Sequence, residues 1–244
     1  MLGLGNSITA GGATSEEVFD GYSILLDGTD DFLENTDFDA TLIQDAYTIS
    51  AWVKVAAGNA TCGIIGLYDN DGDDTYFLRT SNGVIRSQQK NVSAAQQHVA
   101  PSGDIRGSWT HIVATWTKED RMHVYTNGGA SAGGATTTHS SDGDENLQDG
   151  DNGIRIGSQN RDNLSNPFGG LINDIAIWST ELDATAIEAL YNLGKPMDVT
   201  DSYSSNLVAY WKMEEGSGTT VADSSSNSYT LTFSAAPEWS TDIP

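Results

Sequence analysis

Short runs of alternating apolar and polar residues, separated by tight turns, constrain this chain more than any other feature. The run AYTISAWVKV (residues 46–55) places Ile49, Ala51 and Val53 on one face and more polar side chains on the other. A period of two is the pattern of a β-strand with one face buried. Asp-Gly and Asn-Gly pairs, such as Asn127-Gly128, separate several such runs and are typical of hairpin turns. The pattern therefore predicts antiparallel β-structure over most of the 244 residues.

The charge excludes some classes of partner. The chain carries 34 acidic and 11 basic residues, a net charge of −23, which disfavours binding to nucleic acid or anionic lipid. We expect no membrane insertion, because no segment is long and apolar enough to span a bilayer. Cys62 is the only cysteine, so no intrachain disulfide can form, and its apolar neighbours predict a buried side chain.

One segment follows a helical period instead. In TELDATAIEALYNLG, Ile187, Leu190 and Tyr191 recur at helical spacing, with Asp183 as N-cap and Gly194 just past the C-terminal end. The sequence therefore predicts an all-β, two-sheet antiparallel jelly-roll sandwich with one short surface helix.

The order of several segments resembles the laminin-G-like, concanavalin A-like lectin/glucanase jelly-roll family. The resemblance covers roughly residues 23–233 and implies the same fold. The segments that carry it are SILLDGTDDFLE, ISAWVKV, SWTHIVATW, RMHVYTNG, GIRIGSQ and FGGLINDIAIWSTELDATAIEALYNLG.

The segment LVAYWKMEEGSGTTVADSSSNSYTLTF (207–233) resembles the first hairpin of that family, yet it comes last. We therefore expect a circularly permuted jelly roll, since the termini of compact domains often lie close together. A truncated second domain is the alternative, but so short a β segment would lack a core. The expected organisation is a leader or anchoring arm (1–20), the jelly roll (21–236) with Tyr210 and Trp211 in or beside its core, and a C-terminal tail (237–244).

The sequence gives no support for catalysis. Some related jelly-roll enzymes carry a Glu-x-Asp-x-x-Glu strand motif, which the resemblance would place nearest Glu181 and Asp183, but the third acid is missing. Paired carboxylates are the usual requirement for glycoside hydrolysis. We therefore predict that the protein is not an enzyme.

The resemblance implies a structural calcium ion. Family members often hold calcium between the Asp-Gly turn and the later Ile-Asp strand, which correspond here to Asp27, Asp30 and Asp174. Carboxylate oxygens are the ligands that calcium prefers. A second-choice cluster lies in the turn YDNDGDDTY, but its glycine spacing differs from that of an EF-hand loop; its acidic residues are Asp69, Asp71, Asp73 and Asp74.

Sugar-binding residues are harder to identify. Tyr68, Tyr76 and Trp178 are candidates for stacking on a sugar ring, and ordinary packing is the alternative for each. The sequence does not indicate which glycan would bind.

Three classes of function fit the fold. The leader LGLGNSIT is similar to segments of tailed-phage structural proteins, and no export signal is visible in it. We therefore favour a non-catalytic virion structural, decoration or adhesion protein. Its expected partners are a capsid or tail protein bound through the leader, a surface glycan and a second copy of the chain. The alternatives are a secreted, extracellular carbohydrate-binding protein and a glycoside hydrolase.

Overall fold

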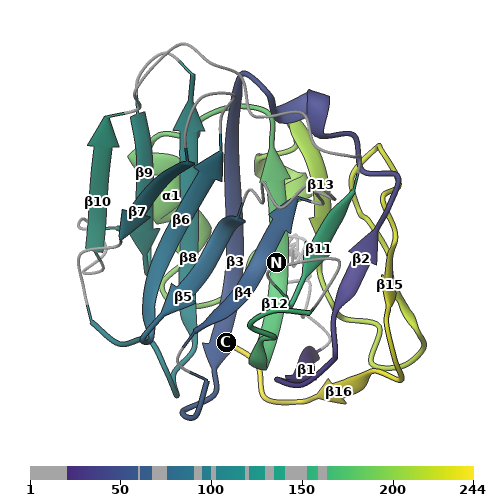
Figure 1. The fold of residues 1–244 in the computed structure, drawn as a ribbon. Helices are drawn as coiled ribbons and strands as arrows, with labels where there is room; N and C mark the ends of the chain where they lie inside the picture. Colours follow the sequence, from purple (N-terminus) through teal and green to yellow (C-terminus); the bar gives the residue numbers. More distant parts are fainter. Residues whose placement is uncertain are drawn as a thin grey trace, which may run out of the picture.

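The computed structural model describes residues 21–59, 61–67, 76–90, 95–99, 103–118, 121–129, 135–140, 153–158 and 164–244. Within these ranges the chain forms two eight-stranded antiparallel sheets that stack face to face (Figure 1). The predicted all-β sandwich is confirmed. The expected leader (1–20) lies outside the described residues.

Sheet A contains the longest strands. Along its path the order is β10 (Ala135–Ser140), β9 (Arg121–Thr126), β8 (Thr110–Thr117), β3 (Ala46–Val55), β12 (Gly169–Trp178), β1 (Ser23–Asp27) and β16 (Glu238–Ser240), with β13 (Leu207–Trp211) also paired to β12.

Sheet B is built from shorter strands. Its order is β14 (Thr220–Val221), β15 (Leu231–Phe233), β2 (Leu33–Asn35), β11 (Ile154–Ile156), β4 (Cys62–Leu67), β5 (Tyr76–Ser81), β6 (Val84–Lys90) and β7 (Ala95–Val99).

One hydrophobic cluster fills the space between the sheets. Tyr47 of β3 lies edge-on to Phe77 of β5, with ring centroids 4.8 Å apart, and 5.6 Å from Trp116 of β8. The inward residues of β3 expected from its alternation, among them Ile49 and Ala51, belong to this cluster. Cys62 is also buried there, as predicted.

The helix α1 (Ala184–Tyr191) covers the outer face of sheet A and is seen behind β8 and β9 in Figure 1. The Asp183 carboxylate accepts a hydrogen bond from the backbone N–H of Ala186 at 2.8 Å, which confirms the predicted N-cap. Gly194 was predicted to follow the helix end directly. The helix instead ends earlier, because Asn192 is already in the left-handed conformation and is its C-cap.

Two further short helices are η1 (Ala40–Ile43) and α2 (Val199–Ser202). None of the helices in the described ranges has the length and apolar character needed to cross a membrane.

The C-terminal segment completes both sheets. Its two expected strands do not form a hairpin with one another: β13 pairs with β12 in sheet A, and β15 pairs with β2 in sheet B. The link between them is fastened by Asp223, whose carboxylate accepts hydrogen bonds from the backbone N–H groups of Tyr210 and Tyr229. Tyr210 and Trp211 are fully buried, as expected.

The expected tail is also part of the sandwich. β16 pairs with β1, so the jelly roll extends to Ser240 instead of ending at residue 236. Beyond it, the Asp242 carboxylate accepts hydrogen bonds from Lys54 of β3 and from the indole N–H of Trp109, which directly precedes β8. The circular permutation itself stays a prediction.

Deleting residues 206–244 should abolish the soluble monomer. The deletion exposes the edges of β12 and β2 and removes Trp211 from the core, and unpaired strand edges promote aggregation. Size-exclusion chromatography should show aggregates, whereas a control that lacks only residues 243–244 should stay monomeric. A monomeric deletion variant that melts cooperatively would contradict this role for the C-terminal segment.

Candidate functional site

A turn rich in aspartate follows β1. β1 ends at Asp27, and Gly28 takes a positive φ of 77° that turns the chain toward Asp30 and Asp31. A Cβ atom on Gly28 would lie 3.1 Å from the Cα of Gly169, so the turn packs directly against the beginning of β12. A side chain at position 28 would therefore be strained as well as crowded.

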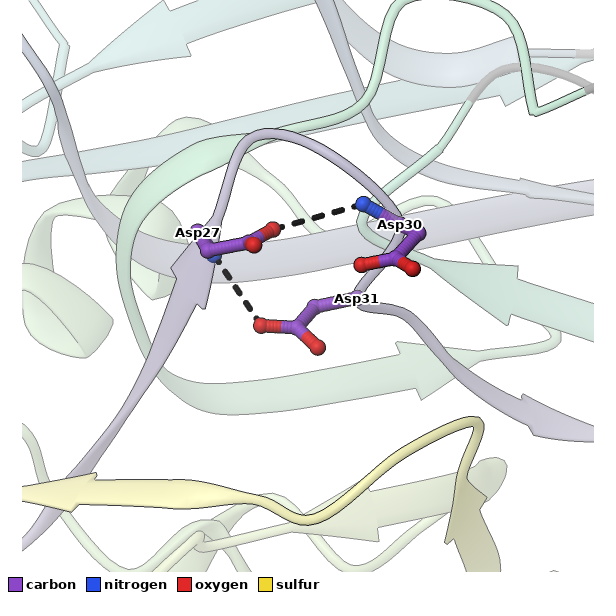
Figure 2. A group of neighbouring side chains, drawn as sticks. All are labelled: Asp27, Asp30 and Asp31. Atoms are coloured by element: carbon purple, nitrogen blue, oxygen red, sulfur yellow. Dashed lines mark hydrogen bonds between the residues drawn. The ribbon is translucent and has the colours of Figure 1, made fainter.

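Three carboxylates converge at this turn. Figure 2 shows Asp27, Asp30 and Asp31 around one small volume, and one carboxylate oxygen from each lies within 4.8 Å of the others. The Asp27 carboxylate accepts hydrogen bonds from the backbone N–H groups of Thr29 at 2.7 Å and Asp30 at 3.3 Å. The Asp31 carboxylate accepts one from the backbone N–H of Asp27 at 3.2 Å.

The local electrostatics favour a cation. The backbone hydrogen bond from Thr29 is the main cause that lowers the pKa of Asp27, so this exposed group stays ionised. Desolvation raises the pKa of Asp31, and the negative charges of Asp27 and Asp30 raise it further. Among the described residues no lysine or arginine forms an ion pair with these three groups. A divalent cation would relieve their mutual repulsion.

One more oxygen donor lies beside the turn. The side-chain amide nitrogen of Asn59 donates to the backbone carbonyl of Pro167 at 3.1 Å, and it would be 3.4 Å from a Cβ on Gly28. The amide oxygen of Asn59 is buried and finds no hydrogen-bond partner in the described part of the chain. Three carboxylates and an amide oxygen are hard donors, so the residues at the turn fit calcium.

The structure does not bring Asp174 to this turn. Asp27 is opposite Gly169 in the β1–β12 register, whereas Asp174 lies farther along β12 in an irregularity between Asn173 and Ala176. Asp174 has a φ of 50° and is buried. Its carboxylate faces Tyr210, whose hydroxyl donates to it at 3.4 Å. Burial raises the pKa of Asp174 well above its usual value. The grouping of Asp174 with Asp27 and Asp30 is therefore wrong, and Asp31 takes the third place.

The other predicted residues have different outcomes. The second acidic cluster and Tyr68 lie outside the described residues, and Tyr76 begins β5 with only its backbone described. Trp178 is fully buried, and its indole N–H donates to the backbone carbonyl of Tyr203 at 2.7 Å. Trp178 is therefore a packing residue, and its prediction as a sugar-stacking ring is wrong.

A serine and a histidine meet on the outer face of sheet A. The Ser50 hydroxyl lies 2.8 Å from Nε2 of His111, and both residues are buried. Burial lowers the pKa of His111 to about 3, so the ring is neutral. Its Nδ1 has no hydrogen-bond partner within the described ranges, so the carboxylate that would orient a catalytic histidine is missing there.

Comparison with known proteins identifies the fold. A laminin G family model, described as the concanavalin A-like lectin/glucanases superfamily, matches residues 27–188. No match was found among curated proteins.

Several solved structures resemble the chain. A Bacteroides ovatus protein described as a candidate carbohydrate-binding protein has a TM-score of 0.65 and 15% identity over 90% of this chain, which spans 59% of that protein. The CBM40 of the Ruminococcus gnavus IT-sialidase, bound to α2,3-sialyllactose, has a TM-score of 0.57 and 16% identity, with 69% of this chain and 96% of that chain covered. A Limulus polyphemus SAP-like pentraxin has a TM-score of 0.52 and 19% identity, covering 71% and 83%. At these identities the likeness establishes the fold.

We propose that the Asp27–Asp31 turn binds calcium, and the melting temperature should test this. A ligand at 100 times its Kd stabilises the native state by about 2.7 kcal/mol, and each kcal/mol raises the melting temperature of a domain this size by about 2–4 °C. Calcium should therefore raise the melting temperature by several degrees, and Asp30→Asn should remove most of that gain.

Asp174→Asn is the matched control, because it makes the same substitution away from the turn, and it should keep the calcium response. Equal melting in calcium and in chelator, or loss of the response only in Asp174→Asn, would show that the turn is not the site.

Proposed function

The chain belongs to the concanavalin A-like lectin/glucanases superfamily, and from this membership we propose that it is a non-catalytic, glycan-binding protein. The observation that carries the proposal is the likeness of its sandwich to a carbohydrate-binding module, CBM40, over 96% of that module. That match covers 69% of this chain and so is not confined to a short motif. A binding protein needs only this scaffold and a recognition surface, whereas an enzyme also needs placed reactive groups.

The contacts of the candidate catalytic groups support a role without catalysis. Asp183 caps α1, and the Glu181 carboxylate accepts a hydrogen bond from the Thr115 hydroxyl at 3.0 Å. Both acids therefore have structural partners. Ser50 and His111 are buried beneath the surface that a substrate would reach. Calcium at the Asp27–Asp31 turn would have a structural part in this scheme, because it would fix the β1–β2 connection against β12.

We further propose that the protein is a component of a virion. The support is the similarity of the leader to tailed-phage structural proteins, together with the net charge of −23, which suits an exposed, soluble surface. In this proposal the leader attaches the jelly roll to a capsid or tail protein, and the jelly roll decorates the particle or adheres to a surface glycan. A secreted carbohydrate-binding protein is the second candidate, favoured by the same structural likeness.

Glycan binding without turnover is the direct test. The full chain should bind at least one class of glycan on an array, in a manner that free glycan competes away. It should release no reducing sugar from β-glucans, agarose or alginate. An unrelated protein of similar net charge controls for nonspecific binding. Turnover that copurifies with the protein and is lost in Glu181→Gln would establish a glycoside hydrolase instead.

Removing residues 1–15 should separate attachment from folding. The glycines of this segment favour a flexible chain over core packing, so its removal should change the melting temperature little. Quantitative mass spectrometry of purified particles should find the full chain incorporated and the truncated chain absent. Equal incorporation of both chains would contradict the anchoring role, and absence of both would favour the secreted protein.

A further inference from the structure

A hollow lies between the C-terminal end of α1 and α2. Its volume is about 700 Å³, within the usual range for small-molecule sites. We call it the α1–α2 pocket. Its lining includes two aromatic rings, two apolar side chains and two polar ones, namely Tyr191, Tyr203, Leu193, Met197, Glu188 and Asn192.

The loop that ends α1 holds a leucine out in solvent. Asn192, Leu193 and Gly194 have successive φ values of 44°, 57° and 93°, all in the left-handed region. Asn and Gly adopt this conformation readily, but a leucine there costs roughly 1–2 kcal/mol. Leu193 is nonetheless 94% exposed, so within this chain its side chain gains little from packing. An exposed apolar side chain on a strained backbone at the rim of a pocket is suited to contact with a ligand.

The aromatic wall of the pocket is held in place from below. The Tyr191 ring stacks on Trp52, with centroids 5.8 Å apart and planes 21° apart. Trp52 in turn lies 5.0 Å from the ring of His111, which is tied to Ser50. This stack fixes Tyr191 before any ligand arrives, and such preorganisation lowers the entropic cost of binding.

The second tyrosine is also supported. The backbone carbonyl of Tyr203 accepts the indole N–H of buried Trp178, and the Tyr203 side chain packs against the cluster of Trp178, Leu190 and Tyr210. Trp178 therefore serves the pocket indirectly, as a positioning residue beneath its wall.

The charge of the lining selects the kind of ligand. Glu188 is the charged member of the lining, and no lysine or arginine is found in it among the described residues. Lys195 follows the loop outside the lining, and nearby Lys212 is paired with Asp198. An anionic ligand would therefore meet Glu188 without a compensating cation.

We propose that the α1–α2 pocket binds an uncharged sugar ring. The apolar C–H face of the ring would lie against tyrosine and Leu193, and its hydroxyls would bond Glu188 and Asn192. A site that bonds hydroxyl groups also discriminates strongly against ligands that lack them. This inference rests on the proposed glycan binding and names the ligand class and its location.

Titration calorimetry of the full chain with neutral oligosaccharides and their sialylated counterparts, such as lactose and 3′-sialyllactose, tests the proposal. At least one neutral glycan should bind more tightly than its sialylated form. Leu193→Asn should weaken that binding by about tenfold, because it removes the apolar contact that the bound sugar would bury. Asparagine tolerates the left-handed backbone, so this variant should fold normally. Glu188→Gln should narrow the difference between the neutral and sialylated glycans.

Leu42→Asn is the matched control, since Leu42 is also an exposed leucine and lies outside the lining. It should leave binding unchanged. Neutral-glycan binding that survives Leu193→Asn would place the site elsewhere while leaving the proposed function intact. Equal or tighter binding of the sialylated forms would overturn the charge argument. Failure of every glycan to bind would instead refute the proposed function itself.

Discussion

The edge of β12 is the constraint on which the rest of this structure depends. One edge of the strand pairs with β3, while the other edge is shared by β1 along its first half and β13 along its second. Where these two strands meet, the side-chain amide of Asn173 donates to the backbone carbonyls of Tyr22 at 2.7 Å and Lys212 at 3.3 Å. Between the start of β1 and the end of β13, no strand in the described ranges pairs with this edge of β12, and the buried Asn173 amide bonds the backbone there instead. It thereby joins segments from opposite ends of the described chain.

This shared edge also sets where the two candidate sites lie. The beginning of β12 receives the aspartate turn, because Asp27 is opposite Gly169. Its end, at Trp178, leads into the segment that forms α1, and Trp178 supports Tyr203 in the wall of the α1–α2 pocket. A calcium ion and a sugar would therefore bind at opposite ends of the same central strand. The buried Asp174 lies between them, and because its pKa is raised in the folded state, its contribution to stability declines as pH rises above about 4.

The sequence predicted the strands well because alternation reports directly on which face is buried, as at Ile49, Ala51 and Val53. It could not predict which sheet each strand joins, and so β13 and β15 were expected to pair with one another. Asp27 and Asp30 were predicted from the family resemblance, and Asp31 stands in the same quoted motif. Asp174 was misplaced because a bulge changes its direction, and a bulge leaves no clear signal in a local pattern. The α1–α2 pocket depends on left-handed residues around Leu193, which helix periodicity does not reveal.

We have proposed that this jelly roll recognises a glycan beside α1. Chemical-shift mapping by NMR of the full chain, titrated with the tightest-binding neutral oligosaccharide, tests it most directly because it locates the contact without a mutation. If the glycan binds beside α1, the largest shifts should fall on the amides of Tyr191 to Gly194 and of Ser202 and Tyr203. Shifts concentrated on any other surface, with these amides unmoved at saturation, would contradict it.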